Sequence, residues 1–541
     1  MIRRDDYRLL TILPLGLGQM DAATSLTSAV AAPRLNWRVT PLRLVAVLTL
    51  LTLAIRLTGL TSRPMWLDEA FSAWFSAQSF HYLWHVLPTY EAHPPFYYSL
   101  LKLWRMAFGG DAVALRSISV LFGVLTIPVV IAAAREHEKL CPTGRPMLRA
   151  GLAGFLAACS PMLVILDQEP RPYPLLILAY TVAILGLLRL IRQFGDGGVG
   201  DWRSWAMIGA GTEITLWSHS LGILYALCLG LALLPAWLRK PMSRDRLFRG
   251  IAVGAAVALA YLPCLLLIAS RAHDWGTNWL HWDTGMLLQL LVLYTVPVEA
   301  LTIGSAVAAL AMVLLIKRAL SSTYASEGWN ADRSVLLVWL GPPMLAALIS
   351  AFFMPVFLAR TLSGTLIPAY LMIAGAVARS DGARERRMIT AAICITLLPC
   401  AFAVALRPSS ERWDLLSAYL SRNVGAGDQV WLYPADSALP LDAVGRRIPG
   451  TVRPIPEPFP TLGFKGPIRA GWPATVSLTP AQATTFANDP AIRGVPVIWL
   501  VTRQSGIFDP TNDVPHALAR SRKAGRMQEW GYINVTPYRR R

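Results

Sequence analysis

Long apolar stretches separated by short polar segments dominate the chain as far as residue 406. A helix needs about 20 apolar residues to cross the roughly 30 Å hydrocarbon core of a bilayer, and somewhat fewer inside a bundle. Eleven stretches meet this requirement, so the pattern predicts an all-α polytopic membrane bundle. The predicted spans are 42–60, 114–134, 150–166, 173–191, 204–218, 221–238, 249–269, 300–317, 335–354, 361–378 and 388–406.

Two further apolar stretches, 95–108 and 284–297, are short and interrupted by polar residues. Such segments are typical of helices that lie in the membrane interface or re-enter it. We therefore expect interfacial helices there rather than additional spans.

The pattern changes at about residue 407, where long apolar runs stop and Pro, Gly, Asp and Thr become frequent. Residues 413–424 predict a helix, and 429–433 and 495–501 predict buried strands. The segment 407–541 is long enough for one small α/β domain.

Composition agrees with the membrane assignment, since 54% of the residues are hydrophobic and only 15% are charged. Lys and Arg are enriched in the cytoplasmic loops of membrane proteins. If the N-terminus lies inside and the spans alternate, the inner segments hold 25 basic residues and the outer loops hold seven. The sequence thus predicts a cytoplasmic tail at 1–41, a membrane domain at 42–406 and an extracytoplasmic domain at 407–541. The net charge of +18 is then mainly a signal of topology, and no nucleic-acid partner is expected.

Polar residues gather in the outer loops 61–113 and 167–172, beginning with Asp68 and Glu69. Adjacent carboxylates at the mouth of an apolar bundle are costly unless they contact a cation, a hydrogen-bond donor or a substrate. Asp68 could act as a general base that takes a proton from an attacking hydroxyl. It could also cap the helix that follows. The spacing alone leaves both interpretations open.

The same outer face is expected to carry His93, Glu169, Arg171, His219 and Arg360. His93 could bind a phosphate, a hydroxyl or a metal, whereas the aromatic residues near it suit a membrane-interface belt. Arg171 offers a rigid fork for a phosphate, although Glu169 and Arg171 could instead form a local ion pair that closes the turn. Arg360 needs a partner such as a headgroup or phosphate. Glu213, inside a span, is a further functional candidate.

Four motifs occur in order along these loops: Asp68-Glu69, His93-Pro-Pro-Phe-Tyr-Tyr98, Ala114–Gly123 and Gln168-Glu169-x-Arg171-x-Tyr173. Together they resemble the polytopic glycosyltransferases of the C superfamily, especially bacterial relatives of protein O-mannosyltransferases and of the aminoarabinose transferase of lipid A. Two later family motifs match in part, at Trp217-Ser-His219 and Phe357-Leu-Ala-Arg360. Ser218, Ser220 and Thr361 depart from the family pattern there.

The resemblance implies an enzyme of the bacterial cytoplasmic (inner) membrane that moves a hexosyl or pentosyl group from a polyprenyl-phosphate carrier to a lipid, glycan or protein acceptor. It implies that Asp68 is the general base, that Glu69 orients Asp68 or contacts the acceptor, and that the anomeric carbon is inverted. Arg171 and Arg360 would hold the carrier phosphate. The sugar or acceptor site would be lined by His93, Glu169, Tyr173 and His219. No cofactor is certain, and a divalent metal is compatible with the clustered carboxylates.

Two other classes of protein are weighed against the glycosyltransferase. A transporter or flippase for a lipid-linked or small polar substrate usually shows paired interrupted helices and ionisable groups near the bilayer midplane. An assembly or receptor subunit would use the membrane part only as an anchor. The sequence shows no internal repeat, and its charged motifs gather at one face, which favours the enzyme.

Overall fold

A computed structural model describes most of the chain beyond residue 39. The described residues are 40–89, 91, 93–240, 242–271, 285, 289–290, 293–294, 303–324, 330–460 and 477–541. Pro41–Arg541 forms one compact unit. The predicted cytoplasmic tail and most of the predicted 284–297 helix lie outside the described residues.

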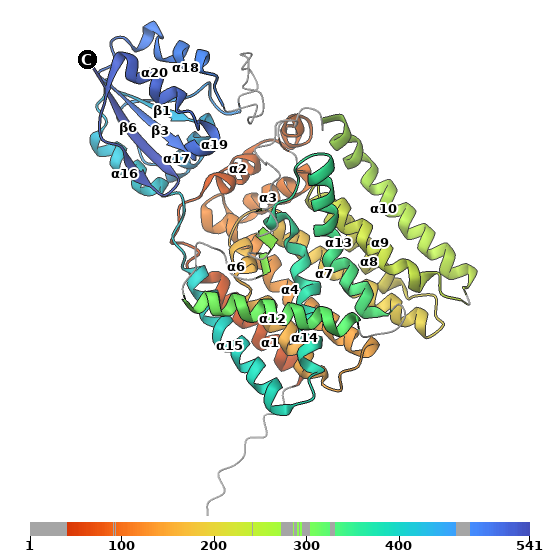
Figure 1. Cartoon of the computed structure of the whole chain (residues 1–541). Helices are drawn as coiled ribbons and strands as arrows, with labels where there is room; N and C mark the ends of the chain where they lie inside the picture. Colours follow the sequence, from red (N-terminus) through yellow and green to blue (C-terminus); the bar gives the residue numbers. More distant parts are fainter. Residues whose placement is uncertain are drawn as a thin grey trace, which may run out of the picture. The chain divides into compact units, whose positions relative to one another are not determined.

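The described residues from 40 to 406 fold mainly into helices (Figure 1). Each predicted span overlaps one or two of these helices, and the predicted interfacial segment 95–108 is the helix α3. In chain order the elements are α1 Pro41–Leu57, α2 Leu67–Ala77, the π-helix η1 Tyr82–Val86, the 3₁₀ turn η2 Leu87–Thr89, α3 Pro95–Phe108, α4 Ala112–Leu140, α5 Pro146–Cys159, α6 Pro161–Asp167, α7 Tyr173–Gly195, α8 Trp202–Ser218, α9 Gly222–Trp237, α10 Arg244–Arg271, α12 Ile303–Tyr324, α13 Ala331–Phe352, the 3₁₀ helix η4 Ala359–Thr365, α14 Leu366–Ala378 and α15 Ala383–Ala405.

Helix length and composition support fewer crossings than the eleven predicted. Among the described residues, six helices are long and apolar enough to cross a membrane, or seven if the bent pair α5–α6 is one span. The difference arises partly because α1 and α8 have only 17 residues and α9 has 16. The exact number of crossings therefore stays a prediction.

The predicted span 150–166 is broken in the structure. The axes of α5 and α6 differ by 55°. Pro161 begins α6 and has no backbone N–H, while the Ser160 hydroxyl accepts from Leu163 N at 3.4 Å. Arg56 donates to the carbonyls of Ala157 and Ala158 at the end of α5. Arg56 is thus 1% exposed and points into the bundle.

Apolar side chains on the outside of the helices fit a lipid environment. α14 is entirely buried and α7 largely so, whereas α10 leaves Leu259, Leu262 and Leu266 exposed. An apolar surface of this extent is not stable in water but is matched by lipid tails. Together with the long apolar helices, this surface indicates a multi-pass membrane protein.

A mixed sheet follows the helical part, as the sequence predicts for its C-terminal α/β region. The predicted helix is α16 Trp413–Asn423, and the predicted strands are β1 Gln429–Tyr433 and β3 Val497–Arg503. The strand order is β2-β1-β3-β6-β4, with β5 also paired to β6. The elements that the sequence reading did not predict are η5 Ala435–Ser437, α17 Ala438–Val444, β2 Thr451–Pro454, α18 Pro480–Ala487, η6 Pro490–Ile492, α19 Ser505–Phe508, α20 Asp513–Ser521, β4 Arg522–Ala524, β5 Gln528–Trp530 and β6 Ile533–Arg540.

Both faces of this sheet are covered by helices (Figure 1). Alternate residues of β1 enter two separate apolar cores: Val430 and Leu432 pack with α16 and α17, whereas Trp431 and Tyr433 pack with α18 and α20. Successive side chains of a strand point to opposite faces, so a continuous apolar strand is expected when both faces are buried.

Candidate active site

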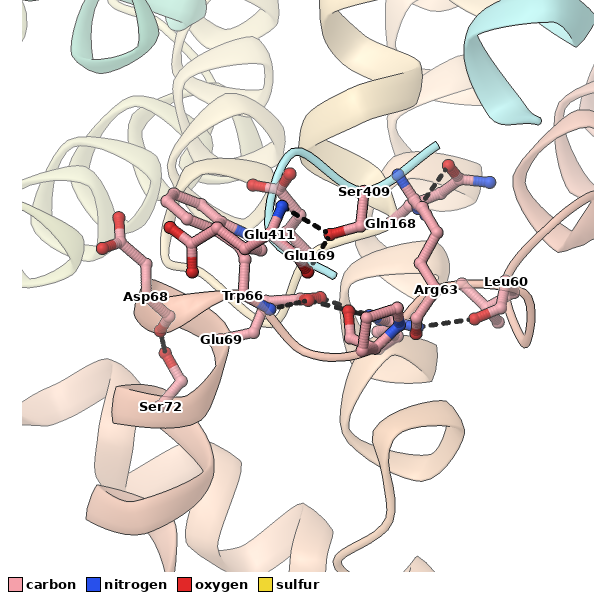
Figure 2. A network of polar contacts seen from close by, with 12 residues as sticks. Leu60, Arg63, Trp66, Asp68, Glu69, Ser72, Gln168, Glu169, Ser409 and Glu411 are labelled. Atoms are coloured by element: carbon pink, nitrogen blue, oxygen red, sulfur yellow. Dashed lines mark hydrogen bonds and ion pairs between the residues drawn. The ribbon is translucent and has the colours of Figure 1, made fainter. Parts of the chain in front are cut away.

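Asp68 and Glu69 occupy the first turn of α2 and face different surroundings (Figure 2). The helix begins at Leu67 with Trp66 as its N-cap residue, so Asp68 is a member of the first turn and not its cap. Neighbouring residues of an α-helix project about 100° apart. The two carboxylates therefore have separate partners. Of the two interpretations left open for Asp68, the helix cap is excluded because Trp66 occupies that position.

Both carboxylate oxygens of Glu69 accept hydrogen bonds. Arg116 Nε donates to Oε1 and Arg116 Nη2 to Oε2, each at 2.8 Å, and both side chains are almost completely buried. The backbone N–H of Trp66 also donates to Oε2, at 3.3 Å. Arg116 further donates to the carbonyl of Leu60 at 2.7 Å. Glu69 thus fastens the start of α2 to α4 and to the turn after α1.

Asp68 lies between two guanidinium groups. Its Oδ2 is 3.0 Å from Arg360 Nη1 and 3.9 Å from Arg171 Nη2. Burial by itself raises the pKa of Asp68, but the charges of Arg360 and Arg171 outweigh it and hold the pKa below its usual value. The carboxylate is consequently ionised and electrostatically paired. Arg171 also donates to the Asp68 carbonyl at 3.4 Å and to the Tyr98 hydroxyl at 3.5 Å.

His93, His219 and Tyr173 form the adjoining wall of the site. The His93 and His219 ring centroids are 4.4 Å apart, and those of His219 and Tyr173 are 5.8 Å apart. Glu91 Oε1 lies 2.5 Å from His93 Nδ1. His219 Nδ1 accepts from Leu221 N at 3.0 Å, which leaves the proton on Nε2. Burial, reinforced by His93, lowers the pKa of His219 well below its usual value, so this ring is neutral.

The Glu169 carboxylate pairs with Arg407 and not with Arg171, so the local ion pair considered for this turn is not formed. Arg407 Nη2 donates to Glu169 Oε1 at 3.2 Å. The neighbouring Gln168 Oε1 accepts from Arg407 at 3.2 Å and from Arg63 at 3.0 Å. Burial raises the pKa of Glu169 despite the opposing charge of Arg407. Glu169 therefore faces the chain segment that follows α15.

Several buried polar atoms around Asp68 have no hydrogen-bond partner within the described part of the chain. Most buried polar atoms in proteins are satisfied, so a concentration of unsatisfied ones marks a place where a polar ligand or water binds. The unsatisfied atoms around Asp68 are Asp68 Oδ2, His93 Nε2, Arg171 Nε, His219 Nε2 and Arg360 Nε. Asp68 Oδ2 is among them because its 3.0 Å contact with Arg360 is an ion pair without hydrogen-bond alignment.

The structure adds residues that the sequence reading did not nominate. Glu91, Tyr98 and Arg407 contact predicted site residues directly. Glu411 and Asp436 are also buried close to the start of α2, and burial raises the pKa of Asp436 to about 6. Tyr98 stands in the quoted His93 motif and Glu91 lies two residues before it, so both could have been found there. Arg407, Glu411 and Asp436 lie beyond the membrane domain, where the sequence shows no motif.

Glu213 has a different partner. Its Oε1 accepts from Trp217 Nε1, one turn later in α8, at 2.7 Å. It therefore does not join the charged cluster around Asp68.

A metal is not well matched by the groups around Asp68, because its nearest partners are two guanidinium groups. Among the described residues, His137, Cys141 and Asp332 bring three possible ligand atoms within 4.8 Å of one another. His137 lies 21 residues after Arg116 in α4, about 30 Å away along the helix. Arg149 Nη2 already contacts His137 Nδ1 at 2.6 Å, and Arg379 contacts Asp332 at 3.4 Å. These positive charges favour an ion-pair network over a bound cation there.

The sequence matches no known family model and no curated protein. Solved structures give clear matches. ArnT from Cupriavidus metallidurans in the apo state is 15% identical, with a TM-score of 0.56, over 92% of this chain and 97% of that one. At this identity the match shows that the chain shares its fold with ArnT.

Two further structures extend this comparison. ArnT bound to undecaprenyl phosphate matches with a TM-score of 0.54, 15% identity and the same coverage of both chains. The apo oligosaccharyltransferase of Archaeoglobus fulgidus matches with a TM-score of 0.55 and 14% identity, over 90% of this chain and 73% of that one. The expected resemblance to this superfamily is confirmed at the level of the fold.

Proposed function

We propose that the protein is a glycosyltransferase of the bacterial cytoplasmic membrane. It transfers a sugar from a polyprenyl-phosphate-linked donor to a lipid, glycan or protein acceptor on the outer face. The observation that carries this proposal is the Asp68 carboxylate, 17% exposed and held between Arg360 and Arg171, among buried polar atoms that lack hydrogen-bond partners in the described part of the chain. The shared fold supports it, because the compared structures include ArnT with undecaprenyl phosphate and an archaeal oligosaccharyltransferase with dolichol phosphate.

Asp68 is assigned the role of general base. It takes the proton from the acceptor nucleophile, whose lone pair attacks the anomeric carbon. The bond between that carbon and the carrier phosphate oxygen breaks, and the phosphate leaves with the electron pair. Attack from the face opposite the leaving group inverts the anomeric configuration.

Arg171 and Arg360 are assigned to the carrier phosphate. Guanidinium groups bind phosphate through parallel charge-assisted hydrogen bonds and stabilise the charge that develops on the leaving group. In the structure the same groups hold the pKa of Asp68 low. When the phosphodiester anion of the donor draws them away, the pKa of Asp68 rises and the carboxylate becomes a stronger base. Donor binding would thereby activate the base.

The other site residues take supporting roles. Glu69 orients Asp68 through its bonds to Arg116 and to the start of α2. His93, Tyr173 and His219 line the sugar or acceptor side. Glu169 is assigned to the rim of the site next to Arg407. The N-terminus is cytoplasmic and the 407–541 domain extracytoplasmic, as the charge distribution predicts.

The test is the Asp68→Asn variant in lipid bilayers with a polyprenyl-phosphate sugar donor. We expect turnover to fall by about a hundredfold or more, because general-base catalysis contributes about 10²–10⁴-fold. Asp196→Asn, which removes an exposed carboxylate 3.5 Å from Arg192, serves as the control and should keep full activity. Full activity of Asp68→Asn would refute the assignment of the base. Donor flux across the bilayer without sugar transfer would indicate a flippase instead.

A further inference from the structure

The helix that carries Asp68 is held at its start by a carboxylate from the segment after the last membrane helix. Glu411 is 1% exposed, and its Oε2 accepts from Leu67 N at 3.1 Å and from Trp413 Nε1 at 2.8 Å. Leu67 directly precedes Asp68 and is the first residue of α2. Its N–H has no acceptor within the helix, and the positive end of the helix dipole favours a carboxylate at this place.

The other oxygen of Glu411 is fixed by the C-terminal sheet. Arg503, at the end of β3, donates through Nε to Glu411 Oε1 at 2.7 Å, and both side chains are buried. The backbone of Glu411 forms a β-bridge with Gly531, and Tyr532 N donates to Ser410 O at 3.0 Å. A single carboxylate thus joins the start of α2 to the sheet.

Two other residues that follow α15, Arg407 and Phe459, contact Glu169 and α2. Arg407 binds Glu169, as described above. The ring of Phe459 lies 5.0 Å from Phe71 and 5.2 Å from Trp74, centroid to centroid, so the C-terminal region also packs along α2 beyond its first turn. α2 is therefore fixed from the membrane domain by Arg116 and from the C-terminal region by Glu411.

We infer that Glu411 is a positioning residue for Asp68. Its charge, balanced by Arg503, fixes the first turn of α2 so that the Asp68 carboxylate faces Arg360 and Arg171, and turnover depends on the docked C-terminal sheet. The inference rests on the proposed function. It also explains why a buried ion pair stands at this junction, since such pairs contribute little net stability but impose a defined geometry.

The experiment compares full-length variants in lipid bilayers with a polyprenyl-phosphate sugar donor. In Glu411→Gln, the side chain keeps its size but loses its charge and one acceptor oxygen. We expect kcat to fall by about ten- to a hundredfold with donor KM nearly unchanged, because displacement of a reacting group by about 1 Å costs rates of this order. The matched control is Asp414→Asn, three residues away, which removes the carboxylate of an exposed pair with Arg412 at 2.7 Å. Its kcat should be unchanged.

A second variant separates positioning from folding. Glu411→Gln leaves Arg503 buried without its partner, whereas Glu411→Gln combined with Arg503→Met removes both charges and is expected to fold. If Glu411 positions Asp68, the double variant folds but kcat per folded molecule stays low. If Glu411 only stabilises the fold, the double variant regains full kcat, which would overturn the inference. A loss confined to donor KM would overturn it as well.

The outcome can be separated from that of the proposed function. An Asp68→Asn variant with full activity would refute the proposed function itself. An inactive Asp68→Asn variant, together with wild-type kcat in both Glu411 variants, would refute only the role of Glu411. Hydrogen exchange of the α2 amides gives a readout independent of turnover, because loss of the Leu67–Glu411 bond should speed exchange in the first turn of α2 and not elsewhere.

Discussion

At the scale of single residues, the chemistry proposed here depends on competition for two guanidinium groups. Arg360 and Arg171 neutralise Asp68 in the structure and are the groups proposed to bind the carrier phosphate. A carboxylate so tightly paired is a weak base, because the positive charges stabilise its ionised form. Asp68 thus has low basicity in the free enzyme. The phosphate of the bound donor would compete for the two guanidinium groups and raise that basicity.

Arg360→Gln should move the acid limb of the pH–rate profile. Burial raises the pKa of Asp68, and Arg360 is the largest charge that opposes it, so its loss raises this pKa. The base is then protonated at a higher pH, and the acid limb of kcat/KM shifts upward by about 1–3 pH units. Measuring kcat/KM from pH 4 to 8 checks this, with substitution of the exposed Arg422 at the end of α16, Arg422→Gln, as the control. An unshifted limb with a lowered plateau would argue against Asp68 as the titrating base.

At the scale of elements, α2 depends on buried ion pairs at its N-terminus. Arg116 binds Glu69 on both oxygens and also holds carbonyls of the turn that precedes the helix. Removal of one partner leaves a buried charge uncompensated, whereas removal of both does not. Substitution of Glu69 or Arg116 alone should therefore lower stability more than substitution of both together.

Arg116→Met should destabilise the protein by about 3–5 kcal/mol, because the buried Glu69 carboxylate loses its partner. Glu69→Gln combined with Arg116→Met should recover part of that loss. Thermal unfolding in the same lipid or detergent measures both effects. A double variant less stable than either single one would show that the pair itself, and not the orphaned charge, dominates the stability of this junction.

The sequence identified this junction only in part. It drew attention to Asp68, Arg171 and Arg360, whose side chains lie together in the structure. It could not tell Asp68 from Glu69 in role, because adjacent residues differ only in the direction in which the helix points them. It also missed Glu411 and Arg407, since a lone carboxylate or guanidinium in a polar segment carries no pattern until the fold brings it to a partner.

At the scale of the whole molecule, the hydropathy pattern predicted where helices lie, whereas the number of membrane crossings that it predicted is not confirmed. Each predicted span overlaps a helix, yet within the part of the chain that the structure describes six helices, or seven with the bent pair, have the length and composition of a full crossing. The break at Ser160 and the inward path of Arg56 depend on contacts between helices that are distant in sequence. Apolar content alone cannot show such contacts, because a broken helix and a continuous one have the same composition.

The predicted orientation can be checked by cysteine labelling. In a variant without the six natural cysteines, Asn423→Cys at the end of α16 should react with a membrane-impermeant maleimide in intact cells, because the 407–541 domain is expected outside. Arg384→Cys, at the exposed start of α15, should react only after the inner membrane is permeabilised. The opposite pattern would reverse the orientation and place the Asp68 site on the cytoplasmic side.

The break between α5 and α6 has a consequence for biogenesis. Neither half, with 14 and seven residues, is long enough to partition alone from the translocon into lipid. The free carbonyls at the break would also be unsatisfied in lipid. Because α1 leaves the ribosome first, Arg56 is already in the membrane when Ala157 and Ala158 emerge. The order of synthesis thus places the Arg56 guanidinium in the membrane before the carbonyls of Ala157 and Ala158 arrive. The α5–α6 segment can therefore insert by pairing with α1 and need not depend on its own hydrophobicity.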